Sequence, residues 1–487
     1  MLVRLANDAV AIACGADAVA DACAAAGIIP ERVSSRGMHW LEPLLDIDGR
    51  GYGPVAPGDV AAILRGEDEH LAIGTIDDHP FLKCQQRLIF ARAGKTRPLS
   101  LEDYAATGGW SGLDIARASA PVDVVETVLA SGLRGRGGAG FPAGIKWRTV
   151  AAAPDPCRYI VCNADEGDSG TFADRMVMEG DPFLLIEGMA IAAHAVGAQK
   201  GFVYIRSEYP VAVARMRAAI GLSRDLIAPF ELEVFVGAGA YVCGEETALL
   251  NSMEGKRGEV RAKPPIPALA GLFGKPTIVN NVLTLAAVPW ILSHGAEAYA
   301  QFGMGRSRGT MPVQLAGNVR YGGLVEIAFG MTLGELVNDI GGGTVGGRPV
   351  KAVQVGGPLG AYIPPEQFHL PFDYEAFAQA EALIGHGGIT VFDDRTHMGR
   401  MARFAFSFCA AESCGKCTPC RLGSTRGVEL MDQILSGDRV ADHIVTMTDL
   451  AEVMKHGSLC ALGGFTPYPV MSALRHWPED FGVSPDV

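Results

Sequence analysis

The chain has 487 residues, 48% of them hydrophobic and 20% charged, and its formal net charge is −13. This length exceeds one ordinary domain, and the composition excludes a disordered chain. The negative charge excludes nucleic acid as the main partner, because phosphate binding requires a basic surface. No apolar run reaches about 18 residues, so we expect no membrane span and a cytoplasmic protein.

The first 95 residues predict a small α/β unit. An apolar stretch over 9–14 precedes an Ala-rich helix over 16–26, and a short helix is expected over 57–64. Residues 96–120 are polar and contain glycine, which predicts a linker.

From residue 121 to about 300 the pattern alternates as βαβ units do. Strands are expected over 158–163, 201–206 and 231–236, and helices over 182–196, 210–222 and 245–253. Strand and helix in this order predict a parallel sheet, with ligand sites at the carboxyl ends of the strands.

Residues 305–395 predict a β-rich domain. Short strands over 311–316 and 352–355 are separated by glycine clusters, and one helix is expected over 332–340. Helical spacing returns from about residue 400, in the segment that holds a group of cysteines.

Four of the eleven cysteines form a metal-binding pattern. Cys414, Cys417 and Cys420 make C-x2-C-x2-C, and Cys460 follows at a distance. One loop that carries three thiolates, completed by a remote fourth, suits a [4Fe–4S] cubane. Zinc sites usually take two separated ligand pairs, so zinc and unligated thiols are the lesser alternatives. Cys409 lies in an apolar run and is expected in the core, and a buried thiol is expected for each remaining cysteine.

Two glycine-rich loops are candidates for ligand binding. Residues 135–140 match G-x-G-x-x-G, although a predicted helix precedes them where a Rossmann strand would stand. They predict a loop that approaches a phosphate or a ring, with Lys146 in reach of an anion, and a structural turn is the alternative. The second loop starts at Gly237 and lacks a P-loop lysine; Glu245 and Glu246 open its helix. These carboxylates either accept hydrogen bonds from a ring or ribose, or stabilise the helix terminus.

Polar residues stand where predicted strands end. Asn163, Asp165 and Glu166 follow the first strand, and Asn280 and Asn281 end an apolar stretch before a helix. Amides and carboxylates at such points suit the edge of an isoalloxazine ring, and each could also be a cap or turn residue.

Five motifs together resemble the 51-kDa flavoprotein family, which includes the NADH-oxidising subunit of complex I and the diaphorase subunits of NAD-reducing hydrogenases and formate dehydrogenases. They are GRGGAGFPAGIKW (135–147), CNADEGDSGTFADR (162–175), GAYVCGEETALLNSMEGKRG (239–258), KPPIPALAGLFGKPTIVNNV (263–282) and ESCGKCTPCR (412–421). The resemblance implies an α/β multidomain fold of four parts. These are a thioredoxin-like domain over 1–95, a Rossmann-like FMN/NAD domain over 100–304, a ubiquitin-like domain over 305–395, and a helical [4Fe–4S] domain over 396–487.

The resemblance also implies cofactors and ligands: FMN, NAD(H) and one [4Fe–4S] cluster. The residues implied to surround FMN are Gly135, Arg136, Gly137, Gly138, Gly140, Lys146, Asn163, Asp165, Glu166, Gly244, Asn280 and Asn281. Phe141, Tyr241, Glu245, Glu246 and Lys263 are implied to place or surround the nucleotide. No catalytic side chain is expected, because FMN carries the hydride chemistry.

The N-terminal pattern resembles a thioredoxin-like [2Fe–2S] domain without its cluster. In the family the second cysteine pair falls near Ser35 and His39, and Cys14 has no partner at the expected spacing. This arrangement resembles the β subunit of soluble NAD-dependent formate dehydrogenases, which exchange formate and NAD+ for CO2 and NADH. The implied partners are a thioredoxin-like [2Fe–2S] subunit and a large iron–sulfur subunit that contains molybdenum. The alternatives are complex I, an NAD-reducing hydrogenase and, as a non-enzyme, a zinc-containing binding module.

Overall fold

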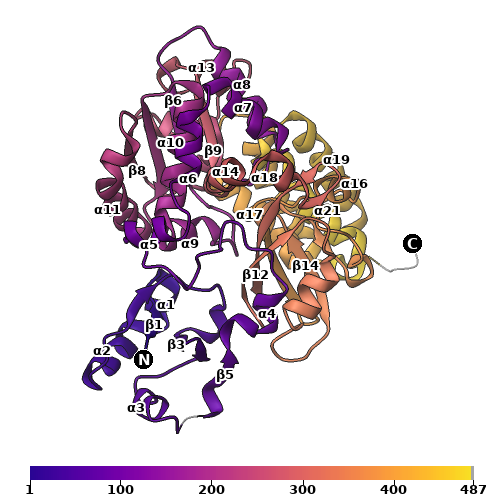
Figure 1. Cartoon of the computed structure of the whole chain (residues 1–487). Helices are drawn as coiled ribbons and strands as arrows, with labels where there is room; N and C mark the ends of the chain where they lie inside the picture. The colour runs from indigo at the N-terminus through magenta and orange to yellow at the C-terminus, as the bar shows by residue number, and fades with distance from the viewer. Residues whose placement is uncertain (68, 484–487) are drawn as a thin grey trace.

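The computed structural model describes residues 1–67 and 69–483. Figure 1 shows the N-terminal unit in indigo below the α/β domain, and the orange and yellow C-terminal half beside that domain. None of the helices in the described ranges combines the length and the apolar character needed to cross a bilayer.

The N-terminal unit has a thioredoxin-like sheet of order β2-β1-β3-β4-β5. Its elements are β1 (Val3–Ala6), α1 (Ala9–Ala13), α2 (Ala16–Ala25), β2 (Glu31–Val33), η1 (His39–Leu41), β3 (Leu45–Ile47), β4 (Arg50–Tyr52), α3 (Val60–Leu64), β5 (Ala72–Thr75) and α4 (Pro80–Lys83). Strand β1 pairs in parallel with β2 across the helices and antiparallel with β3, which continues into the β3–β4 hairpin. A βαβ unit followed by a hairpin is the arrangement that the family resemblance implied.

The linker expected over residues 96–120 is wrong, because this segment forms α5 (Leu101–Ala106) and α6 (Ser111–Ala118). Ser100 caps α5 by accepting from Asp103 N. The start of α6 is held by the buried carboxylate of Glu187, which accepts from Trp110 N and Leu113 N. Buried Leu113 and Ala116 recur in α6 at helical spacing, a local signal that the glycines of this segment obscured.

The α/β domain has the predicted parallel sheet, with order β8-β7-β6-β9. Its elements are α7 (Pro121–Ala130), α8 (Ala143–Ala152), β6 (Tyr159–Ala164), α9 (Ala173–Gly180), α10 (Pro182–Val196), β7 (Lys200–Arg206), α11 (Pro210–Ile227), β8 (Glu231–Gly237), η4 (Tyr241–Gly244), α12 (Glu246–Met253), α13 (Pro267–Ala270), β9 (Thr277–Asn281), α14 (Val282–His294) and α15 (Ala296–Ala300). Helix α10 is buried along nearly its whole length, as its apolar composition requires. Asn280 and Asn281 are the last residues of the fourth strand, β9.

The β domain has the strand order β13-β12-β16-β14-β15, in which only β12 and β16 are parallel. Its elements are β10 (Gly303–Met304), β11 (Ser307–Arg308), β12 (Thr310–Gly317), β13 (Gly323–Ala328), η6 (Glu335–Ile340), β14 (Val350–Val355), β15 (Tyr362–Ile363), α16 (Tyr374–Gln379) and β16 (Gly388–Asp393). The hairpins β12–β13 and β14–β15 lie on either side of β16, which is parallel to β12 and antiparallel to β14. This strand arrangement is the ubiquitin-like topology. The helix expected over 332–340 is the short, π-type η6.

The C-terminal segment is a helical bundle that carries the four cysteines at or near the starts of its helices. It consists of α17 (Met398–Glu412), α18 (Thr418–Ser436), α19 (Val440–Gly457), α20 (Ala461–Phe465) and α21 (Pro467–His476). Cys417 stands at the start of α18 and Cys460 at the start of α20. Cys420 lies within the first turn of α18.

The β domain is joined to the other parts by a buried carboxylate. Glu326 of β13 accepts from Ile89 N and Phe90 N in the segment that leaves the N-terminal unit. The N-terminal unit also contacts the α/β domain, where Ala9 N donates to Glu179 of α9. The first 95 residues are therefore docked on two neighbours.

Candidate functional site

The carboxyl ends of β6 and β9 lie side by side, with Asn163 in register with Asn281. The glycine-rich loop between α7 and α8 approaches the same edge, because a Cβ at Gly137 would lie 2.9 Å from Asn281 Cβ. Two segments that were separate in the sequence therefore meet at one sheet edge, where ligands of parallel sheets bind.

The loop depends on glycine for its conformation. Gly138 and Gly140 have φ of +106° and +60°, which side chains disfavour. Arg136 is fully buried, and its guanidinium donates to the carbonyls of Thr310 and Arg308 in the β domain. The side chain of Arg136 thus anchors the loop, and the glycines provide its open surface.

Four charged side chains form a chain of ion pairs beside this edge. Lys146 Nζ lies 3.2 Å from one Glu246 oxygen, and Lys263 Nζ lies 2.9 Å from the other. Lys263 also pairs with Glu245, which caps α12 by accepting from Thr247 N. Burial would raise the pKa of Glu246, but the two lysines outweigh it and lower that pKa. This carboxylate is held ionised and can accept hydrogen bonds from a nucleotide.

Asp165 is the residue whose surroundings point most directly to a ligand. It is 2% exposed, burial raises its pKa to about 7, and its Oδ2 has no hydrogen-bond partner among the described residues. A Cβ at Gly167 would lie 3.0 Å from this oxygen, and one at Gly244 would lie 3.3 Å away. A buried, unsatisfied acceptor lined by bare glycines fits a bound polar ring or ribityl chain, and so fits FMN.

Other predicted residues lie at this edge with their side chains already paired. Asn163 Nδ2 donates to Gly244 O, and Asn280 Oδ1 accepts from the buried indole of Trp147. Glu166 accepts from Asp174 N and Arg175 N at the start of α9. These side chains hold the walls of the site.

The two aromatic residues predicted to place the nucleotide differ in their surroundings. Phe141 is half exposed at the end of the glycine loop, which leaves its ring free for stacking. Tyr241 is directed elsewhere: its hydroxyl donates to Asp168, and its ring packs edge-on against Phe408 of α17. Tyr241 therefore lies between the nucleotide edge and the cysteine-bearing helices.

The four predicted cluster ligands converge on this side of the α/β domain. Cys414 and Cys460 pack against one apolar cluster, and Cys417, Cys420 and Cys460 against the adjoining cluster that includes Tyr241. Among the described residues, no three cysteine sulfurs lie within 4.8 Å of one another. Their order in the sequence, three within seven residues and a remote fourth, suits a cubane, in which each thiolate binds a different iron.

Cys409 is buried as predicted, and its Sγ lies 4.0 Å from Cys420 Sγ. Their hydrogen bond lowers the pKa of Cys420 to about 6, which favours the thiolate that iron binds. The expectation of burial also holds for Cys23, Cys162 and Cys243 and is wrong for Cys14, Cys84 and Cys157, which are exposed. Isolated cysteines have no pattern from which burial can be read.

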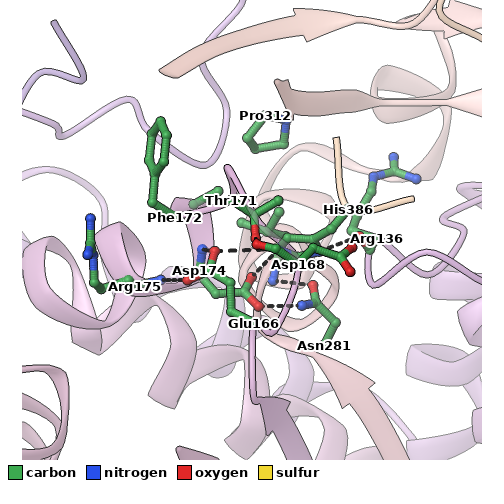
Figure 2. A network of polar contacts seen from close by, with 12 residues as sticks. Arg136, Glu166, Asp168, Thr171, Phe172, Asp174, Arg175, Asn281, Pro312 and His386 are labelled. Carbon is green, nitrogen blue, oxygen red and sulfur yellow. Dashed lines mark hydrogen bonds and ion pairs between the residues drawn. The ribbon is translucent and has the colours of Figure 1, made fainter. Parts of the chain in front are cut away.

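Three residues of the site were not singled out from the sequence: the half-buried Asp168 and the buried Asp174 and His386. The two aspartates lie within the motif of residues 162–175, but no spacing marked them. His386 comes from the β domain and meets them only through the packing of two domains (Figure 2).

Comparisons with known proteins agree with this geometry. Residues 128–290 match the Nuo51 FMN-binding domain, and residues 400–483 match the iron–sulfur binding region of NADH-ubiquinone oxidoreductase-F. The chain is 43% identical over 414 residues to the NADP-reducing hydrogenase subunit HndC of Solidesulfovibrio fructosivorans, a match that covers 83% of this chain and 84% of that one. It is 42% identical over 392 residues to the F 2 subunit of NADH-quinone oxidoreductase of Rhizobium meliloti, a match that covers 78% of this chain and 93% of that subunit.

A solved structure extends the likeness to the whole chain. A crystal structure of an air-oxidized NAD+-reducing [NiFe]-hydrogenase matches 99% of this chain and 84% of that one, with a TM-score of 0.73 and 31% sequence identity. The chain therefore belongs to the 51-kDa flavoprotein family of NADH-quinone oxidoreductases and NAD-reducing hydrogenases, and it has that family's FMN-binding domain and 4Fe–4S-binding region.

Proposed function

We propose that the chain is a diaphorase subunit, which exchanges a hydride between NAD(H) and FMN and passes single electrons through one [4Fe–4S] cluster. The observation that carries this proposal is the position of Tyr241, which donates to Asp168 and packs against the apolar cluster that contains Cys420. FMN, when bound, supplies the chemistry that joins two-electron to one-electron transfer. The two sites are adjacent, as such a relay requires.

In this proposal the side chains of the protein bind and orient FMN and NAD(H). The glycine loop allows close approach of the flavin phosphate, with the Lys146 ammonium near by. Asp165 offers its free oxygen to the flavin or its ribityl chain. Glu246 and Lys263 bind the nucleotide, and Phe141 stacks on it. None of these side chains acts as a nucleophile.

Glu246→Gln tests the binding role. With an artificial acceptor that takes electrons from flavin, the KM for NADH should rise while kcat changes little, because a binding contact is lost. Glu233→Gln, at an exposed carboxylate on β8, is the matched control and should change neither value. Loss of one limb of a bell-shaped pH–rate profile in Glu246→Gln would instead show acid–base catalysis and refute the binding role.

We further propose that the complex is a cytoplasmic NAD-dependent formate dehydrogenase, in which electrons pass from a molybdenum-containing iron–sulfur subunit toward NAD+. The support is the N-terminal unit. Residues 1–95 contain three cysteines, Cys14, Cys23 and Cys84, too few for a [2Fe–2S] cluster. In place of the second cysteine pair, Ser35 N donates to Asp8, and the His39 ring packs at a tilt against Phe172.

An NAD-reducing hydrogenase is the second candidate, favoured by the structural match over 99% of the chain. Purification of the native complex and metal analysis distinguish the two. Molybdenum with formate-dependent NAD+ reduction supports the formate dehydrogenase, whereas nickel with hydrogen-dependent reduction supports the hydrogenase. Co-purification of a thioredoxin-like [2Fe–2S] subunit is expected in the first case.

A further inference from the structure

His386 is a buried histidine that reaches from the β domain into the α/β domain. It lies in the loop between α16 and β16 and is 5% exposed. Its Nδ1 lies 2.9 Å from the carbonyl oxygen of Arg136 in the glycine loop. A carbonyl oxygen can only accept, so Nδ1 carries a proton and donates.

The other ring nitrogen faces two carboxylates (Figure 2). His386 Nε2 lies 3.2 Å from Asp174 Oδ1 and 3.6 Å from Glu166 Oε1. In a neutral ring with Nδ1 protonated, Nε2 would present a lone pair to these oxygens. A second proton removes this repulsion and satisfies both Nε2 and Asp174 Oδ1, which otherwise lack hydrogen-bond partners among the described residues.

The charges around the ring favour the protonated form. Burial lowers the pKa of His386, but Asp174 and Glu166 outweigh burial and raise it well above its ordinary value. Asp168 adds a third carboxylate at longer range. The guanidinium of Arg136 is directed away, toward carbonyls of the β domain.

The same carboxylates are tied to the walls of the flavin site. Asp174 Oδ2 accepts from Asn281 Nδ2, and Asn281 Oδ1 caps α14 by accepting from Leu283 N. Glu166 joins the end of β6 to the start of α9 through its two backbone acceptor bonds. One ring thus contacts the glycine loop on one side and the ends of β6 and β9 on the other.

We propose that His386 is a constitutively protonated positioning residue, whose imidazolium clamps the glycine loop against the strand ends that form the FMN pocket. This inference rests on the proposed FMN site and deepens it. His386 acts through Arg136 and Asp174 and does not itself need to touch the flavin. Removal of its charge leaves buried carboxylates without a counter-ion, and the pocket loosens.

A metal ion is the competing occupant, because Glu166, Asp174 and His386 each offer a ligand atom within 4.8 Å of the others. Both oxygens of Glu166 already accept backbone N–H groups, and one oxygen of Asp174 accepts from Asn281. The remaining pair, Asp174 Oδ1 and His386 Nε2, is separated by a hydrogen-bond distance of 3.2 Å. A proton satisfies this pair without moving either atom.

The experiment measures FMN affinity of the full chain at pH 8 by quenching of flavin fluorescence. His386→Gln should weaken FMN binding about tenfold or more. Asp174→Asn added to His386→Gln should restore most of that loss, because it removes the uncompensated negative charge. His443→Gln is the matched control: His443 is also buried and bonded to a carbonyl, but it lies on α19, and its variant should bind FMN normally.

Three results would overturn the proposal. If Asp174→Asn restores nothing in the His386→Gln background, the histidine fills space and its charge has no role. If NMR of ring-labelled histidine in the unsubstituted chain shows a neutral His386 at pH 7, the imidazolium is absent; this measurement needs no folded variant. A zinc-dependent change in that signal would likewise overturn it in favour of a metal site. Failure of the unsubstituted chain to bind FMN would instead refute the proposed function.

Discussion

The backbone N–H of Tyr241 donates to the carboxylate of Glu412 over 3.1 Å. Tyr241 begins η4 beside the proposed nucleotide site, whereas Glu412 ends α17 two residues before Cys414, the first of the proposed cluster ligands. A single charge-assisted hydrogen bond therefore joins the nucleotide loop to the cysteine loop. We expect a substitution that breaks this hydrogen bond to alter the position of both loops.

Glu412→Ala should raise the KM for NADH about tenfold in the artificial-acceptor assay, because a hydrogen bond to a charged group contributes about 1.5–3 kcal/mol. Glu412→Gln keeps a carbonyl acceptor and should stay within about twofold of the unsubstituted chain. The visible spectrum must show an intact cluster in both variants. Equal defects in the two variants would mean that the bond to Tyr241 does not position the loop.

Cys420→Ser should remove or destabilise the cluster, because a hydroxyl is a poor iron ligand at neutral pH. NADH oxidation by an acceptor that takes electrons from flavin should persist, whereas turnover of the natural donor with NAD+ should fall more than about tenfold. FMN content and iron content are measured on the same sample. With FMN retained and the cluster absent, undiminished turnover of the whole complex would show that the cluster is structural.

Cys409→Ser is the matched control for Cys420→Ser, because the sulfurs of Cys409 and Cys420 lie 4.0 Å apart in one buried environment. Because Cys409 is expected to pack and not to bind iron, Cys409→Ser should retain about four irons. A cluster that survives Cys420→Ser and is lost in Cys409→Ser would reverse the ligand assignment.

Iron analysis of the FMN-loaded chain should give about four irons per FMN, as one cubane requires. The N-terminal unit contributes none, because its three cysteines are split between a buried site and two exposed sites. A value near six, together with a [2Fe–2S] signal in electron paramagnetic resonance, would contradict this expectation.

Glu42→Gln should stabilise the N-terminal unit at pH 8 and have little effect at pH 5. Burial raises the pKa of Glu42 to about 7 from its ordinary 4.5, so the folded state binds a proton more tightly than the unfolded state. Protonated Glu42 contributes its full share to the free energy of unfolding below pH 4.5, and this contribution is lost as pH rises through 7. Above that pH, ionisation of Glu42 lowers the free energy of unfolding by about 3 kcal/mol, at 1.36 kcal/mol for each pKa unit.

Hydrogen exchange of β1 and β3 measures this effect within the full chain, where global unfolding is not two-state. A glutamine at position 42 can still pair with Ser35 and Leu44 N, so the pH dependence should flatten with the fold retained. Glu67→Gln, at an exposed carboxylate of the same unit, is the control. An unchanged pH profile in Glu42→Gln would show that Glu42 is not the titrating group.

The regular elements of the α/β domain could be predicted from the sequence. Strands β6, β7 and β8 and helices α10 and α12 lie within about a residue or two of the expected ranges, because burial within one element leaves a local periodicity. The iron–sulfur pattern was equally local, since three of its four cysteines lie within seven residues of sequence.

The tertiary structure decided the features that depend on distant segments. The start of helix α6 depends on Glu187, which is 74 residues away from Leu113. The exposure of Cys14 and Cys157 could not be predicted, because single cysteines form no periodic pattern. His386 and Arg136 are 250 residues apart and meet through the docking of one domain on another. Sequence periodicity indicates which face of an element is buried. It does not indicate which buried groups of separate domains form a hydrogen bond. That pairing depends on distances and local electrostatics that only the packed structure defines.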